Sequence, residues 1–224
     1  MEVKKSKKEV VKRYILFMIG LLIMGLGVAV TKRGELGVSP ISSVPNVLSI
    51  KLDFLTLGNW LIIWNCLLLL GQILILRKDF KFIQLLQIPV SFLFGYFTDF
   101  GLKLASFVRN DCYAVRLGLV ILGTAILGMG IALTVIANVV MNSGEAFVKA
   151  VSDKINKHFG NVKIAFDIFC VLLSIIVSLF CFDFKILGTR EGTIFAAVFT
   201  GIAVKLFLKL LSKPIQRILV CKPE

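Results

Sequence analysis

The sequence predicts an all-α membrane protein with six transmembrane helices, arranged as two inverted three-helix repeats. Each repeat is expected to carry a short broken or re-entrant helix after its first span. Three observations predict this fold. The 224 residues are 58% hydrophobic and only 17% charged, which lies outside the usual composition of water-soluble domains. Six apolar runs are long enough to cross a bilayer, and the chain aligns with itself at an offset of about 103 residues.

The six apolar runs define the predicted spans. A helix needs about 20 mostly apolar residues to cross a ~30 Å hydrocarbon core. The predicted spans are 14–30, 59–76, 82–107, 116–137, 162–181 and 192–211. They divide the chain into a basic cytoplasmic tail (1–13), a first repeat (14–107), an outer linker (108–115), a second repeat (116–211) and a second cytoplasmic tail (212–224).

The basic residues predict the orientation, because cytoplasmic loops of membrane proteins are enriched in lysine and arginine. With the N-terminus inside, most of the 26 basic residues fall in cytoplasmic segments, and both termini are cytoplasmic. The basic residues then left outside are Lys32, Arg33, Lys51, Lys103, Arg109, Arg116, Lys185 and Arg190. Topology and contact with the lipid bilayer thus account for the net charge of +13, and no nucleic acid partner is expected.

The internal repeat is clearest in the first and fourth spans. Six identities fall within twelve aligned positions, and glycines dominate them. They pair Gly20, Ile23, Gly25, Gly27, Ala29 and Thr31 with Gly123, Ile126, Gly128, Gly130, Ala132 and Thr134. Three spans per unit is an odd number, so the second unit is expected to be inverted, as in many transporters. A duplication kept only as a stable scaffold is the alternative.

A polar stretch too short to cross the membrane follows the first span of each unit, at 36–46 and at 138–146. Broken backbone is tolerated at membrane depth only where protein or a water-filled cavity satisfies its polar groups. Two half-helices that enter from opposite faces would meet this condition. Their N-termini would favour an anionic or carbonyl-bearing small solute. The alternative is a pair of interfacial helices that lie flat at the headgroups.

Local signals place the start of each short helix. Ser39 and Asn142 are expected to be N-caps, since serine and asparagine favour that position. Glu145 and Lys149 have the spacing of an i,i+4 ion pair.

Polar residues in and near the two breaks are the predicted solute-binding residues. From the first unit they are Ser39, Ser42, Ser43, Asn46 and Asn65, and from the second Asn138, Asn142, Ser143, Glu145 and Asp167. Asp167 lies inside the fifth span, where a carboxylate costs about 2.5 kcal/mol or more unless it is paired or hydrated. It is expected to bind a cation, relay a proton or pair with Lys163.

No catalytic apparatus is visible, so the protein is not expected to be an enzyme. The sequence has no HExxH, GxSxG or phosphate-loop motif. No cofactor and no metal are expected, because the lone His158 sits in a basic loop and the five cysteines show no CxxC spacing.

Three stretches resemble the YczE/YyaS/YitT family of bacterial membrane proteins. They are Gly37-Val38-Ser39-Pro40-Ile41-Ser42-Ser43, Gln87-Ile88-Pro89-Val90-Ser91-Phe92-Leu93-Phe94-Gly95-Tyr96 and Arg190-Glu191-Gly192-Thr193. The resemblance covers nearly the whole chain and implies a multi-pass protein of the bacterial cytoplasmic membrane. It implies no set of functional residues.

The predicted function is a small transporter or channel whose solute site lies between the inverted repeats near the midplane. One alternative is a substrate-capture subunit of a multicomponent importer, which needs an energising partner. Another is a membrane scaffold or sensor that moves no solute. An oligomer is compatible with the sequence, which leaves the substrate, the direction of transport and the coupling ion open.

Overall fold

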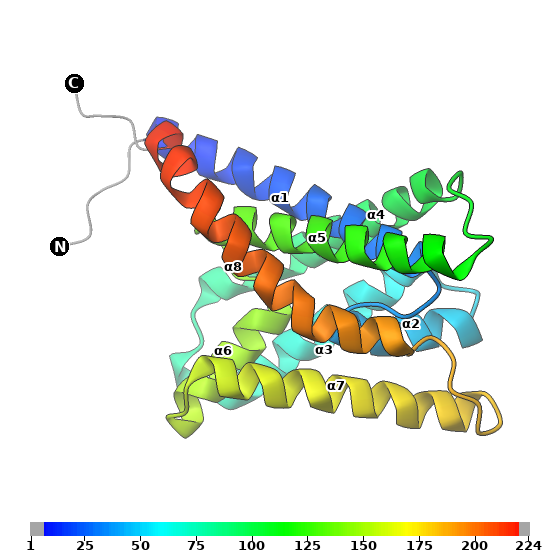
Figure 1. Cartoon of the computed structure of the whole chain (residues 1–224). Coiled ribbons are helices and arrows are strands. Elements are labelled where there is room, and N and C mark those ends of the chain that lie inside the picture. The colour runs from blue at the N-terminus through cyan, green and yellow to red at the C-terminus, as the bar shows by residue number, and fades with distance from the viewer. Residues whose placement is uncertain (1–6, 220–224) are drawn as a thin grey trace.

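Six long apolar helices dominate the computed structural model, which describes residues 7–219 (Figure 1). Some residues used in the predictions lie outside the described residues: Lys4, Lys5 and Lys222, which contribute to the predicted orientation, and Cys221, one of the five cysteines. The long helices are α1 (Lys7–Arg33), α3 (Leu57–Leu76), α4 (Gln87–Ala105), α5 (Tyr113–Ala137), α7 (Phe159–Cys181) and α8 (Glu191–Leu219). Each is long and apolar enough to cross a bilayer. The chain is therefore a multi-pass, all-helical membrane protein.

The long helices extend beyond several predicted span boundaries. Helix α1 begins at Lys7 rather than at residue 14, and α8 continues to Leu219, past Pro214. The third span begins with the 3-10 turn η2 (Phe82–Leu86) before α4. Hydropathy marks the part of a helix that lies in hydrocarbon, whereas polar turns can continue the same helix into the headgroup region. The boundaries of the tails, linker and repeats remain predictions.

Two short helices, α2 (Pro40–Lys51) and α6 (Ser143–Ile155), follow the first and fourth long helices. Helix α2 packs against α7, α3 and α8, and α6 packs against α3 and α7. Most of α2 is buried, from Ser42 through Val47. A helix that lay flat at a membrane surface would bury one face only. The 3-10 turn η1 (Arg77–Asp79) ends the α3 segment.

The centre of the fold is an antiparallel contact between α1 and α5. Gly20 lies beside Thr134, Gly27 beside Leu127, and Thr31 beside Gly123, so the residue numbers rise in one helix as they fall in the other. Glycines let the two backbones approach closely, which is how helices commonly pack within a bilayer. Helix α4 covers α1, and α8 covers α5.

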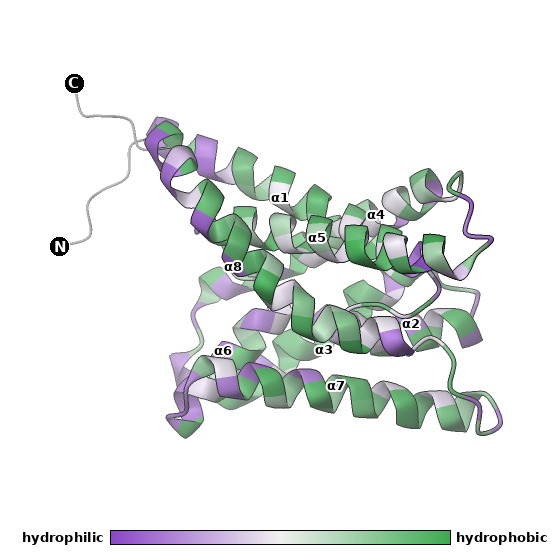
Figure 2. Cartoon of the chain, in the orientation of Figure 1, coloured by the Kyte–Doolittle hydropathy of each residue, from purple (hydrophilic) through white to green (hydrophobic). Residues whose placement is uncertain are grey.

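Apolar side chains form a large core and a smaller one. The large core lies along α1, α3, α4 and α5, and its buried members are Phe17, Leu21, Met24, Val28, Leu57, Leu61, Val90, Phe94, Leu127 and Ala137. The smaller core joins α3, α6 and α7 through Leu68, Val148, Phe166 and Cys170. Figure 2 shows apolar residues along the lengths of the long helices and hydrophilic residues gathered near their ends. This pattern suits a lipid-facing surface.

Candidate functional site

The N-termini of the two short helices meet inside the helix bundle. A Cβ built on Gly144 would lie 2.9 Å from Cδ1 of Ile41, so the first turn of α6 touches the first turn of α2. The two segments that are too short to cross the membrane therefore meet at the first turns of their helices. Pro45 has no N–H to donate to the carbonyl of Ile41, which leaves that carbonyl without its usual helical bond. The arrangement brings helix N–H groups and a free carbonyl together.

The structure confirms both predicted N-cap positions, but the two caps differ. The Asn142 side chain accepts a hydrogen bond from the backbone N–H of Ser143 at 2.9 Å. The hydroxyl of Ser39 instead donates to the hydroxyl of Ser42 at 3.0 Å and makes no cap bond. Pro40 at the first position of α2 fixes the helical φ angle and removes one donor that a cap would serve.

The polar face of α2 is turned toward α7 and the segment before α8. Ser43 is fully buried and donates to the carbonyls of Pro40, at 2.6 Å, and Cys170, at 3.3 Å. Asn46 donates through Nδ2 to the carbonyl of Gly188 at 2.7 Å, while its buried Oδ1 has no hydrogen-bond partner. These contacts hold the first break against the second half of the chain.

The polar face of the second break is turned toward α4. The hydroxyls of Ser143 and Ser91 are both buried and lie 3.3 Å apart. Ser91 also bonds the carbonyl of Gln87 at 2.7 Å. The second break is thus tied to the first half of the chain.

Three charged residues gather beside the two helix N-termini. Lys163 and Asp167 form an i,i+4 ion pair on α7, which is one of the three roles expected for Asp167. The half-buried Glu145 interacts electrostatically with both of them. The predicted ion pair between Glu145 and Lys149 is wrong, because Lys149 pairs with Asp153 at 3.3 Å instead. Glu145 is half-buried within the bundle, whereas Lys149 and Asp153 are exposed.

Glu145 lies on α6, outside the six spanning helices. Burial raises the pKa of its carboxyl; Lys163 lowers this pKa and Asp167 raises it. When the pKa of a carboxyl is higher in the folded than in the unfolded state, the protein loses stability as the pH rises from the ordinary pKa of the carboxyl to the raised pKa.

Replacing Glu145 with glutamine should remove this decline in stability with rising pH. The difference in unfolding temperature between Glu145→Gln and the wild type should therefore grow in favour of the variant as the pH rises. Thermal unfolding in detergent across a pH series measures this difference. The control Asp153→Asn, two turns along the same helix, should follow the wild-type profile. If the stability of Glu145→Gln declined with rising pH as much as that of the wild type, Glu145 would not be the cause of the decline.

Two further predicted site residues lie at the end of α5 and on α3. Asn138 is exposed and ends α5 in the left-handed conformation, with a φ of 49°. Asparagine tolerates that conformation well, so a helix-ending role accounts for it. Asn65 is buried on α3, at 3% exposure, within the layer that packs against α6.

Two pairs of buried polar side chains were not among the predicted site residues. Gln87 Nε2 donates to Gln72 Oε1 at 3.1 Å, and the hydroxyls of Ser174 and Thr189 lie 2.9 Å apart. The two pairs correspond to each other in the repeat, because both members shift by 102 positions. In the sequence, these pairs are visible as polar residues at matching positions of the two repeats, near the ends of apolar runs. Hydropathy averaged over a long window does not reveal them, because the neighbouring residues are apolar.

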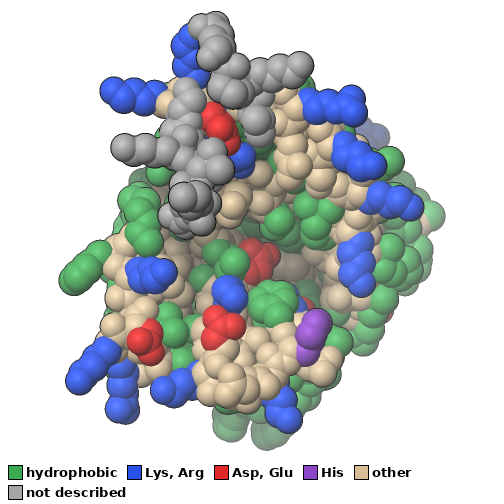
Figure 3. Space-filling model, turned by 90° about the vertical axis from the view of Figure 1, so that its left-hand side faces the viewer, with side chains coloured by type: hydrophobic (Ala, Val, Ile, Leu, Met, Phe, Trp, Pro, Cys, Tyr) green, Lys and Arg blue, Asp and Glu red, His purple; other side chains and the backbone are tan. Residues whose placement is uncertain are grey.

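A groove of about 550 Å³ opens at the end of the molecule where α3 and α6 end. Figure 3 shows this end hollowed in its middle, with acidic and basic side chains around the hollow. The groove walls include 139–141 of the second break, as well as Gln72 and Gln87. It therefore leads from one end of the molecule toward the second break.

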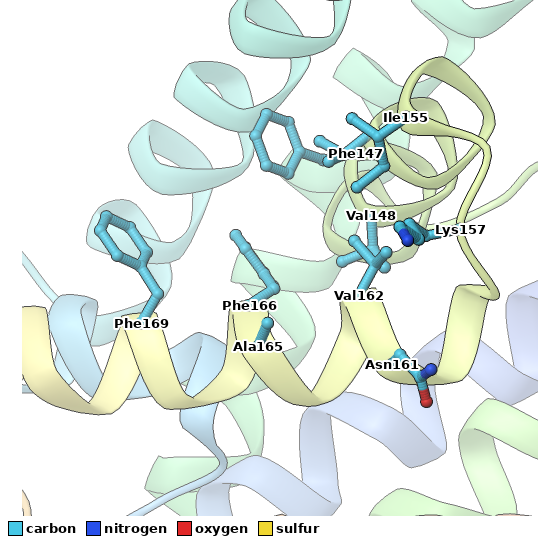
Figure 4. A pocket seen from close by; sticks show the side chains of 10 residues that line it. Phe147, Val148, Ile155, Lys157, Asn161, Val162, Ala165, Phe166 and Phe169 are labelled. Carbon is cyan, nitrogen blue, oxygen red and sulfur yellow. The ribbon is translucent and has the colours of Figure 1, made fainter.

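A second, apolar groove of about 420 Å³ lies between α6 and α7. In Figure 4, Phe147 and Val148 of α6 and Val162 and Phe166 of α7 line this space. The apolar lining suits an acyl chain or side-chain packing rather than a polar solute.

Comparison with known proteins supports the predicted resemblance. Residues 11–209 match the model of a family of unknown function, DUF6198. The chain is 29% identical over 126 residues to the uncharacterized protein YyaS of Bacillus subtilis (strain 168). That match covers 51% of this chain and 59% of the relative's length. No solved structure matches the chain. Because the family model covers most of the sequence, the chain belongs to the DUF6198 family.

Proposed function

We propose that the protein is a membrane transporter for a small polar solute, with its site where the two broken segments meet. The observation that carries this proposal is the contact between the first turns of α2 and α6, through Ile41 and Gly144. Two half-helices that meet between inverted repeats are a recurrent way to build a transport site.

Reciprocal contacts between α1 and α5 support the inverted repeat. A Cβ on Gly20 would meet Thr134, and a Cβ on Gly123, the repeat mate of Gly20, would meet Thr31, the mate of Thr134. Contacts that exchange partners in this way are expected for two copies related by a two-fold axis. Since the two helices are antiparallel, the axis would lie in the membrane plane and invert one copy relative to the other.

The contacts of the short helices follow the same rule. Helix α2 of the first unit packs on α7 of the second, and α6 of the second unit packs on α3 of the first. The hydrogen-bonded pair Gln72 and Gln87 has its counterpart in Ser174 and Thr189. These exchanges favour re-entrant half-helices over helices that lie at the headgroups.

One difference between the halves fits a transporter better than a scaffold. Helix α3 packs along α4, with Gly58 against Gly95, whereas α7 and α8 share no extended contact within residues 7–219. Two copies of one unit in different conformations can exchange those conformations, which is the basis of alternating access. In this proposal both termini are cytoplasmic, and the groove of Figure 3 opens to the cytoplasm.

The charged group beside the helix N-termini is the proposed coupling site. Glu145 and Asp167 share one lysine, so the group has one more acid than base when all three are ionised. A proton or a cation would balance it. The proposal includes no catalytic step.

Uptake by reconstituted protein tests the proposal. Proteoliposomes with the full chain should accumulate at least one solute from a radiolabelled panel of nucleobases, amino acids, organic anions and inorganic anions. The double variant Glu145→Gln/Asp167→Asn should lose most of this uptake. Losing a charge-assisted hydrogen bond costs about 1.5–3 kcal/mol, roughly tenfold or more in rate.

The control is Asp111→Asn, which removes an exposed acid from the linker and should leave uptake unchanged. Uptake that keeps its rate and its pH dependence in the double variant would refute the coupling role. No uptake of any solute by the wild type would refute the proposal that the chain transports by itself.

A further inference from the structure

The groove of about 550 Å³ has a polar wall whose hydrogen-bonding groups are only partly used within the protein. Three glutamines line it: Gln72, Gln84 and Gln87. Gln72 and Gln87 are each only 2% exposed. We call this space the carboxamide groove, and its size lies within the roughly 300–1,000 Å³ typical of small-molecule sites.

Two of these carboxamides have unpaired oxygens. Gln87 donates to Gln72, but the Oε1 atoms of Gln87 and Gln84 are buried without a hydrogen-bond partner. A buried acceptor without a donor is costly, and most such groups in folded proteins are satisfied. The terminal torsion of glutamine is broad, so each carboxamide can turn toward a group that enters the groove.

Charges of both signs surround the groove. Lys149 pairs with Asp153, and Asp79, Lys81 and Lys154 complete the ionisable lining. Lys149 and Asp153 keep about half of their side-chain surface exposed. The buried polar wall itself carries amides only, and amides favour an uncharged ligand that both donates and accepts hydrogen bonds.

The geometry points to the carboxamide groove as a binding site for a small uncharged solute with adjacent N–H and C=O groups, such as a carboxamide, a ureide or a pyrimidine base. The N–H groups of the solute would bond the Oε1 atoms of Gln84 and Gln87. Its carbonyl would accept from a glutamine amide. Binding in the groove stands on these contacts alone, and the step from ligand to transported substrate rests on the proposed function.

The groove is connected to the second break. Gln87 accepts through its carbonyl from Ser91, whose hydroxyl lies 3.3 Å from that of Ser143 at the start of α6. At the corresponding place in the other half, Gly188 lies against Asn46 and Ile50. The pair Ser174 and Thr189 there has the same hydrogen-bonding role but lies outside the groove lining, so it offers a matched control.

Thermal unfolding of the detergent-purified full chain tests this inference. The probes are uracil, allantoin and propionamide, with sodium benzoate and sodium phosphate as comparators. At least one amide-bearing probe should raise the unfolding temperature in a concentration-dependent manner. In Gln87→Leu the apparent affinity for that probe should fall roughly tenfold or more, since a paired polar group is lost. Gln84→Leu should act likewise, and it carries the test if Gln87→Leu does not fold.

Thr189→Val is the control, because it removes the corresponding hydrogen bond of the other half and should keep the response to the probe. The inference is overturned if no amide-bearing probe shifts the unfolding temperature, or if the shift persists undiminished in both glutamine variants. A shift with benzoate or phosphate alone overturns it as well. Probe binding without uptake into proteoliposomes would refute transport while keeping the groove as a binding site.

Discussion

Replacing Gly27 with alanine is expected to destabilise the protein strongly. A Cβ at this position would lie 2.5 Å from the backbone nitrogen and 2.7 Å from the Cα of Leu127 on α5. Backbone atoms of a long packed helix cannot move aside as a side chain can, so α1 and α5 must separate. Overpacking of this kind costs about 1–3 kcal/mol or more. In a chain of this size, each kcal/mol lowers the unfolding temperature by about 2–4 °C.

Two further glycines make this prediction specific. Gly130, the repeat mate of Gly27, meets the backbone nitrogen of Met24 at 2.6 Å, so Gly130→Ala should lower the unfolding temperature by a similar amount. Gly118, also on α5, has nothing within 4 Å of an added Cβ. Gly118→Ala should be neutral or stabilising by about 0.5–1 kcal/mol, through helix propensity. Equal losses in Gly27→Ala and Gly118→Ala would contradict the close contact between α1 and α5.

The second large effect is expected at Lys163. Lys163→Met leaves the carboxylate of Asp167 without its ion-pair partner. Removing one partner of a buried pair costs about 3–5 kcal/mol. The side chains of Lys163 and Asp167 are 26% and 18% exposed, so the loss should fall near the lower end, at about 3 kcal/mol. Chemical or thermal unfolding of the purified variant measures it.

The double variant Lys163→Met/Asp167→Asn should recover much of the lost stability, because no unpaired Asp167 charge remains. Lys149→Met provides a matched control, since Lys149 and Asp153 form an ion pair of the same i,i+4 spacing. That pair is exposed, and exposed pairs contribute only about 0–1 kcal/mol. If both lysine variants lost the same stability, Lys163 would not have the role assigned to it here.

The six spans could be predicted from the sequence because hydropathy over about 20 residues reflects the thickness of the bilayer directly. The short helices and their caps could also be predicted, since Ser39 and Asn142 precede Pro40 and Ser143 in patterns that start helices. The ends of helices outside the hydrocarbon could not be predicted in this way. Helix α8, for example, continues past Pro214.

Side-chain partners were less predictable than helices. Lys149 has an acid four residues away on either side, Glu145 and Asp153, and sequence spacing favours neither strongly. The fold decides between them, because Glu145 is half-buried and interacts with Lys163 and Asp167, whereas Asp153 is exposed beside Lys149. The glutamines of the carboxamide groove were missed for a related reason: Gln72 and Gln87 become neighbours only when α3 packs on α4.

Labelling of single cysteines most directly tests the central claim, that the two three-helix halves are inverted relative to each other in the membrane. In a background with the native cysteines replaced by alanine, Asp53→Cys lies just beyond α2 and Lys157→Cys just beyond α6, and both positions are exposed. A membrane-impermeant maleimide should label Asp53→Cys in intact cells and Lys157→Cys only after permeabilisation. Labelling of both positions from the same side would contradict the inverted arrangement and the transport site built on it.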